Sequence, residues 1–241
     1  NKNNSENLFN LPSVETAGAS NVFGATKERS AAGGSILAND PHFELSAPSL
    51  FYLARLQLNN GGIIGASVPG TPIILSGRNE KLAWGITASY LDDQDIFIEE
   101  KNASNPNLYR TEEGWEKFKV DKQYIKIKNS SDIEIERKWT KNGPVLPTTA
   151  FDLLSITPKR HVASLSWTAL TEEDTTVSAA INLMLSQNVE KGLAALESFH
   201  APSLNFLLVD NDKIVLKTVG KMPKRSPLNQ TQGRMPSLGW K

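Results

Sequence analysis

Short apolar runs, broken by glycine, proline and asparagine, fill the chain between residues 20 and 100. Runs of this length, bounded by turn-forming residues, are typical of β-strands rather than of helices. We therefore predict strands at Asn21–Ala25, Ser35–Ala38, Leu50–Leu58, Ile63–Val68, Ile73–Leu75, Leu82–Ala88 and Asp95–Glu99.

The pattern changes twice after residue 100. Over residues 109–146 polar and apolar positions alternate, as in half-buried strands, and Asn129–Asp132 has the composition of a hairpin turn. A strand predicted at His161–Leu170 is followed by two segments with apolar residues at helical spacing, Val177–Ser186 and Val189–Ser198. Strands on both sides of a helix pair predict a layered α+β fold.

The ends of two elements carry recognisable signals. Ser186 or Asn188 has a side chain suited to cap the second helix. A last hairpin is predicted from Leu204–Val209 and Ile214–Val219, which flank the turn Asp210–Asp212. Residues 1–19 are polar and aperiodic, and are predicted to form a flexible lead-in.

The amino-acid composition bears on the kinds of partner that the protein binds. Lys and Arg number 26, as do Asp and Glu, so the formal net charge is zero and neither a nucleic-acid nor a polybasic membrane partner is indicated. The longest apolar runs are too short to cross a bilayer. The absence of cysteine excludes disulfides, thiolate metal sites and cysteine nucleophiles, and is compatible with life outside the cytoplasm.

Conventional catalytic motifs are also missing. No Gly-x-Ser-x-Gly pentad occurs, and the nearest string, Gly65–Pro69, lacks the closing glycine. The three histidines are far apart, without metal-ligand spacing, and no phosphate-binding glycine loop is present. The pattern of residues alone therefore predicts a soluble α+β domain and indicates no specific function.

An ordered set of short motifs carries more information. They are Gly18–Gly24, Leu37–Phe43, Gly65–Gly70, Gly77–Glu80, Ala83–Ala88 and Asp92–Asp95. In this order and spacing they resemble the start of the large subunit of penicillin acylases and of their relatives, the cephalosporin and acyl-homoserine-lactone acylases. The resemblance runs from Ser20 to the end of the chain and is densest up to Phe97.

The resemblance implies an N-terminal-nucleophile hydrolase with an αββα sandwich, incomplete in this chain. Residues 1–19 would be the end of a spacer, and residues 20–241 the first part of the large, or beta, subunit. The family's small alpha subunit, cut from the same precursor, would be the protein partner. We expect the 241 residues alone to lack amidase activity, because an uncut bond before Ser20 leaves its nitrogen without basicity.

The same resemblance assigns the nucleophile. Ser20 would become a new N-terminus when the precursor cuts the Ala19–Ser20 bond. Its hydroxyl would attack the substrate, and its α-amine would act as base, since such an amine has a pKa of about 7.7–8.0. Read without the resemblance, Ser20 is an ordinary strand or turn serine.

Three further positions match family residues that act around the serine. The backbone N–H of Ala88 and the side chain of Asn205 match the donors to the oxyanion, and Arg225 matches an arginine that orients the asparagine and the amine. Outside the resemblance, Asn205 reads as a strand-edge asparagine and Arg225 as part of a solvated basic loop.

Other family positions concern substrate and metal. His42 matches a residue whose backbone and side chain contact the nucleophile, and Phe43 matches a wall of the acyl pocket. Further wall positions, Ser76 and Ile86, depart from the aromatic pattern of penicillin G acylases and leave the acyl preference open.

An acidic stretch resembles a structural calcium site. Its oxygen ligands would come from Asp92, Gln94 through its carbonyl, and Asp95, with other ligands from outside this chain. Alone, the stretch reads as a solvated acidic loop. No cofactor is implied for catalysis.

The implied activity is hydrolysis of an N-acyl amide, such as the side-chain amide of a penicillin, through an acyl-enzyme. The alternatives are an N-acyl-homoserine-lactone or a cephalosporin or glutaryl acylase, and a binding module without activity on the same fold. The family's location implies a bacterial protein of the periplasm or exterior.

Overall fold

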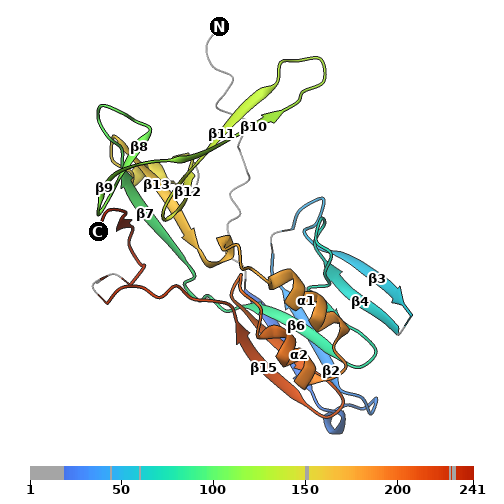
Figure 1. The fold of residues 1–241 in the computed structure, drawn as a ribbon. Helices are drawn as coiled ribbons and strands as arrows, with labels where there is room; N and C mark the ends of the chain where they lie inside the picture. The colour runs from blue at the N-terminus through green and yellow to red at the C-terminus, as the bar shows by residue number, and fades with distance from the viewer. Residues whose placement is uncertain (1–18, 44, 60, 150–151, 228, 230–231) are drawn as a thin grey trace. The chain divides into compact units, whose positions relative to one another are not determined.

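The computed structural model describes residues 19–43, 45–59, 61–149, 152–227, 229 and 232–241 (Figure 1). They form two compact units interleaved along the chain. Unit 1 holds the residues up to Tyr90, Thr175–Phe199 and Ser203–Gly220, and unit 2 holds the remainder. The predicted lead-in falls, except for Ala19, outside the described residues, and the boundary between residues 19 and 20 stays a prediction.

Unit 1 is built on a six-stranded antiparallel sheet in the order β15-β14-β6-β5-β4-β3. Its strands are β3 (Tyr52–Leu58), β4 (Gly61–Ser67), β5 (Ser76–Arg78), β6 (Ala83–Ala88), β14 (Leu204–Val209) and β15 (Ile214–Val219). The hairpin predicted at the end of the chain is confirmed with both its strands, because the turn between them is strongly marked in the sequence.

Helices α1 (Thr176–Leu185) and α2 (Val189–Leu196) cover one face of this sheet. Of the two predicted caps, Asn188 serves α2, because its side chain accepts a hydrogen bond from Lys191 N at 2.9 Å. No helix among the described residues combines the length and the apolar character that crossing a membrane requires.

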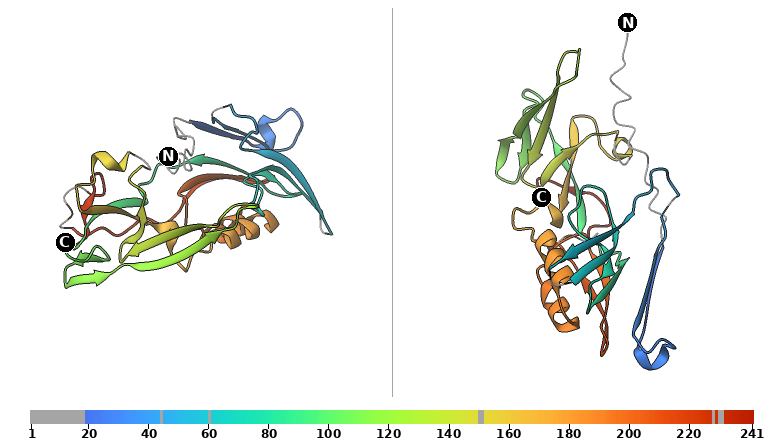
Figure 2. Two further views of the ribbon diagram at one scale, coloured as in Figure 1. Left: turned by 90° about the horizontal axis from the view of Figure 1, so that it is seen from above. Right: turned by 90° about the vertical axis from the view of Figure 1, so that its right-hand side faces the viewer.

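The opposite face of the sheet carries a two-stranded hairpin, β1 (Ser20–Ala25) and β2 (Ile36–Pro41), joined through the short 3-10 turn Lys27–Arg29. The right-hand view of Figure 2 shows the helices on one side of the sheet and this hairpin on the other. Gly24 makes the close approach possible, since a Cβ there would lie 3.1 Å from Ile214 Cγ2 and 3.2 Å from Leu207 Cδ2. Helix, sheet and hairpin layers confirm the predicted α+β class.

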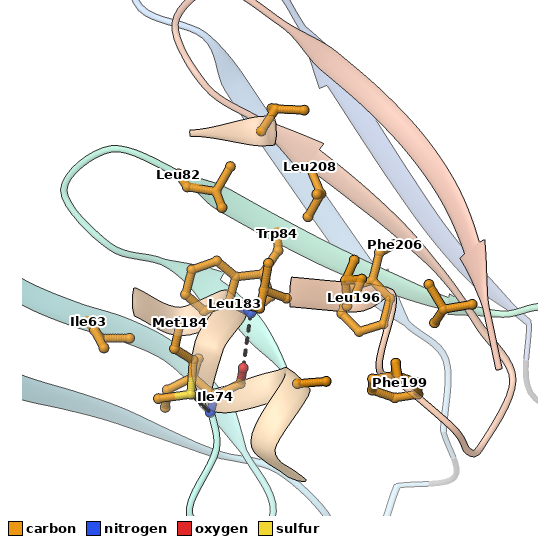
Figure 3. Packing of buried hydrophobic residues seen from close by; sticks show 13 residues of the cluster. Ile63, Ile74, Leu82, Trp84, Leu183, Met184, Leu196, Phe199, Phe206 and Leu208 are labelled. Atoms are coloured by element: carbon orange, nitrogen blue, oxygen red, sulfur yellow. Dashed lines mark hydrogen bonds between the residues drawn. The ribbon is translucent and has the colours of Figure 1, made fainter. Parts of the chain in front are cut away.

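The core of unit 1 lies between the helices and the sheet (Figure 3). Trp84 is fully buried, and its Nε1 donates to Ile74 O at 3.0 Å. Ile74 N in turn donates to the sulfur of Met184 at 3.3 Å. The prediction of a strand at Ile73–Leu75 is therefore wrong, since β5 begins only at Ser76. Side chains, and not a neighbouring strand, satisfy the backbone polar groups of Ile74.

Unit 2 contains a second six-stranded sheet, in the order β10-β11-β12-β13-β7-β16. Its strands are β7 (Gln94–Glu100), β10 (Lys119–Ile125), β11 (Ile133–Thr140), β12 (Gly143–Leu146), β13 (His161–Trp167) and β16 (Ser237–Leu238). A separate pair, β8 (Leu108–Thr111) and β9 (Gly114–Lys117), and the 3-10 turn Leu153–Ser155 complete the unit. The strand predicted to reach Leu170 ends at Trp167, and Thr168–Leu170 form a 3-10 turn instead.

Candidate active site

Ser20 is the first residue of β1 and lies opposite Pro41 of β2. The carbonyl oxygen of Ala19, on the predicted scissile bond, accepts a hydrogen bond from His42 N at 2.9 Å. The chain on both sides of this bond is therefore held by the hairpin partner strand and by the residue after it. A fixed carbonyl is what attack by a neighbouring hydroxyl requires.

The side chain of Asn39 ties this hairpin to the sheet. Asn39 Nδ2 donates to Asn21 O and to Ile86 O, both at 2.9 Å, and Ile86 N donates to Asn39 Oδ1 at 3.0 Å. The contact is close because Gly85 has no side chain: a Cβ there would lie 2.8 Å from Val22 Cγ2. The residue after Ser20 is thus linked, through one amide, to the strand that contains Ala88.

Asn205 stands on the same face of the sheet as the hairpin, opposite Thr87 of β6. Its Nδ2 bonds Thr87 Oγ1 at 3.2 Å and Ala88 O at 3.3 Å. Its Oδ1 accepts from Thr218 Oγ1 at 2.7 Å. The amide is therefore held in one orientation, with its donor end toward the backbone of Ala88.

These contacts place three of the predicted residues in one region of unit 1. Ser20 belongs to a hairpin that contacts β6, Ala88 ends β6, and Asn205 lies on the next strand. Connected strands that carry a serine, a backbone N–H and an amide donor suit attack on a carbonyl and stabilisation of the oxyanion formed.

His42 contacts the region through its backbone. Its ring Nε2 lies 2.9 Å from Asp40 Oδ2, and the side chains of His42 and Asp40 are 42% and 73% exposed. The backbone of His42 thus contacts the residue before the predicted nucleophile, through the bond from His42 N to Ala19 O. The ring of His42 lies beside the carboxylate of Asp40 in β2.

The predicted acyl-pocket positions lie in different surroundings. Phe43 is half-exposed and meets Phe51 edge to face, with ring centroids 5.5 Å apart. Ile86 packs against the core on the helix side of the sheet. Ser76 Oγ donates to Trp84 O at 3.4 Å. A shared wall formed by Phe43, Ile86 and Ser76 stays a prediction.

Arg225 and the predicted calcium ligands belong to unit 2, so the expected contact between Arg225 and Asn205 of unit 1 stays a prediction. Arg225 Nε donates to both carboxylate oxygens of Asp95 at 3.0 Å. Its Nη2 lies 3.0 Å from Asp92 Oδ2 and donates to Asp92 O at 3.1 Å. Within the described residues no group of three or more acidic, histidine or cysteine side chains could hold a metal ion.

Two residues of the site were not predicted from the sequence. Asn39 lies within the motif Leu37–Phe43, but nothing in the local sequence reveals its bonds to residues 18 and 47 positions away. Thr218 could have been found: the two predicted strands of the last hairpin pair it with Asn205 in the structure, and a threonine opposite an asparagine can bond to it.

Replacing Asn39 by aspartate will destabilise unit 1 although the two side chains have the same shape. The new carboxylate oxygen will face the carbonyls of Asn21 and Ile86, two acceptors that in the wild type each accept a hydrogen bond from Asn39 Nδ2. We expect a loss of roughly 2–4 kcal/mol in the free energy of unfolding, measured by urea denaturation. Asn211→Asp, the same change at an exposed turn residue, is the control, and equal stability of the two variants would contradict this role.

Comparisons with known proteins bear on the family and on the fold. A family model described as penicillin amidase matches residues 1–241. The acyl-homoserine lactone acylase QuiP of Pseudomonas aeruginosa is 28% identical over 92% of this chain, which spans 26% of that protein. Penicillin G acylase of Escherichia coli is 31% identical over 61% of the chain, which spans 18% of its length.

A solved structure supports the same conclusion for the fold. A thermostable penicillin G acylase from Alcaligenes faecalis matches with a TM-score of 0.75 at 24% identity, over 92% of this chain and 38% of that one. The expectation of an N-terminal-nucleophile fold is thereby confirmed. The chain spans about a quarter or less of the length of the two curated relatives.

Proposed function

Because the chain belongs to the penicillin amidase family, we propose that the protein hydrolyses an N-acyl amide bond with Ser20 as an autoprocessed N-terminal nucleophile. The observation that carries the proposal is the arrangement around β6. Asn39 ties the strand that begins at Ser20 to Ile86, two residues before Ala88, and Asn205 bonds the carbonyl of Ala88. Nucleophile and oxyanion donors thus come from connected strands.

The proposed reaction begins with cleavage before Ser20, which creates a free α-amine. Ser20 Oγ attacks the acyl carbonyl carbon, and its proton passes to that amine, directly or through a water. Ala88 N–H and Asn205 Nδ2 stabilise the oxyanion. The C–N bond then breaks, and the leaving amine takes the proton from the α-amine. Water attacks the resulting ester, which releases the carboxylic acid and restores the Ser20 hydroxyl.

The substrate proposed first is an N-acyl homoserine lactone. QuiP, named for that activity, matches 92% of the chain, whereas the Escherichia coli penicillin G acylase matches 61%. Ser76, at a predicted wall position, also offers no aromatic ring for the aromatic side chain of penicillin G. A penicillin-type amide is the second candidate, favoured by the description of the family model.

A substrate panel tests the activity. The full-length protein is incubated separately with penicillin G and with short-chain and long-chain acyl homoserine lactones, and mass spectrometry follows the free amine and acid. We expect release of homoserine lactone to exceed release of the penicillin nucleus, and no release by Ser20→Ala. A matured protein with an N-terminus at Ser20 that hydrolyses none of these would place the activity on another N-acyl amide. A protein that neither matures nor hydrolyses would support the binding module.

The proposal extends to the protein partner and the location. An alpha subunit from the same precursor would complete the substrate site, in keeping with the small share of the relatives' length that the chain matches. Several large apolar side chains of the hairpin and of the neighbouring strands, among them Phe23, Leu53 and Leu216, are exposed and could pack against such a partner. A location in the periplasm or outside the cell is proposed from the family resemblance.

A further inference from the structure

The acidic stretch that resembles a calcium site is filled by a side chain of the same chain. Arg225 makes four contacts of 3.0–3.1 Å with it, two to the carboxylate of Asp95, one to the carboxylate of Asp92 and one to the carbonyl of Asp92. The side chains of Arg225 and Asp95 are only 10% and 9% exposed. The pair is therefore a buried one, in which each charge depends on the other.

The backbone around the guanidinium is shaped to receive it. Gly233 has a φ of +85°, and a Cβ at this position would lie 2.5 Å from Arg225 Nε and 2.6 Å from its Cζ. Only a residue without a side chain allows the segment after Arg225 to lie so close to the guanidinium. Arg225 is thus enclosed between an acidic strand end and a glycine.

The donor set does not fit a calcium ion alongside this arginine. Calcium needs six to eight oxygens at about 2.3–2.6 Å. Both carboxylate oxygens of Asp95, one of Asp92 and the Asp92 carbonyl already face a guanidinium. A guanidinium keeps its charge at all ordinary pH values, so a divalent ion among these oxygens would meet a permanent positive charge.

We propose that Arg225 is the resident cation of this site, in the place that the resemblance gives to calcium. The arginine neutralises Asp92 and Asp95 and fixes the segment after β15 to the start of β7. The inference concerns unit 2 and does not depend on the activity proposed for Ser20.

Unfolding temperatures test the proposal on the full-length protein, each measured with EDTA and with excess calcium chloride. Arg225→Met should lower the unfolding temperature by on the order of 5 °C or more in both solutions, because it leaves two carboxylates without their cation. Arg234→Met, at an exposed arginine of the same segment, should leave it unchanged. An Arg225→Met protein as stable as the wild type would overturn the proposal.

The calcium response of Asp95→Asn gives the second measurement, and it remains decisive if Arg225→Met fails to fold. The proposal expects the wild type and Asp95→Asn to shift equally when calcium replaces EDTA, since no calcium is bound between these carboxylates. A calcium-dependent rise in the wild type that disappears in Asp95→Asn would show a metal ion at this site and would refute the arginine's role.

Discussion

Ser20→Ala will leave the full-length protein as one uncut chain without acylase activity. The same hydroxyl is proposed to attack the Ala19 carbonyl during maturation and the substrate carbonyl during turnover. Without it the first step cannot occur, and the nitrogen of residue 20 stays an amide that accepts no proton at neutral pH. We expect hydrolysis to fall below about one part in ten thousand of the wild-type rate.

Intact-mass measurement distinguishes this result from a loss of folding. The wild type should yield a chain that starts at Ser20, separate from the part that precedes it, and the alanine variant a single chain with the mass of the uncut precursor. Ser46→Ala, at an exposed serine of the connection between β2 and β3, should mature and turn over normally. An alanine variant that still splits between residues 19 and 20 would show that Ser20 is not the nucleophile.

Asn205→Ala will lower kcat by roughly two to three orders of magnitude while changing KM little, the loss typical of one oxyanion donor. The amide acts on charge that develops only in the transition state, so substrate binding should hardly depend on it. The rate is referred to the amount of chain that starts at Ser20, so that slow maturation is not counted as slow turnover. A loss of less than about threefold would exclude Asn205 as a donor.

Thr218 offers a matched comparison for this measurement. Its hydroxyl holds the Oδ1 end of Asn205 at 2.7 Å, and valine has the same shape without the hydroxyl. Thr218→Val should therefore lower kcat in the same sense as Asn205→Ala but by less, and Thr218→Ser should restore it. Equal rates for the valine and serine variants would show that the hydroxyl does not orient the amide.

Local patterns predicted most of the elements, and failed where the partners of a segment lie far away. The β14–β15 hairpin was found because a polar turn separates two apolar runs. Ile73–Leu75 was misassigned because the backbone groups of Ile74 bond the side chains of Trp84 and Met184, which no local pattern reveals. The interleaving of the two units was also not predicted from the sequence.

The residues of the candidate site were even harder to predict from local patterns than the strands and helices were. Residue types alone did not single out Ser20 as the nucleophile, and its assignment depended on the family resemblance. Asn39 escaped notice because its importance comes from hydrogen bonds across 47 residues. Arg225 was linked to Asn205 by resemblance, whereas its described partners, Asp92 and Asp95, lie 133 and 130 positions away. Charge pairing over such distances depends on the fold and not on any spacing visible in the chain.

Alternate residues of β6 face opposite sides of the sheet and serve different purposes. Trp84 and Ile86 point into the core, whereas Gly85 and Thr87 face the hairpin and Asn205. Substitutions at Thr87 can therefore change the surroundings of Asn205 with little effect on the core, whereas those at Trp84 and Ile86 change the packing of the core. A single-residue insertion or deletion would exchange the two sets at once. Evolution and engineering can thus explore this strand by replacement, while its length stays fixed.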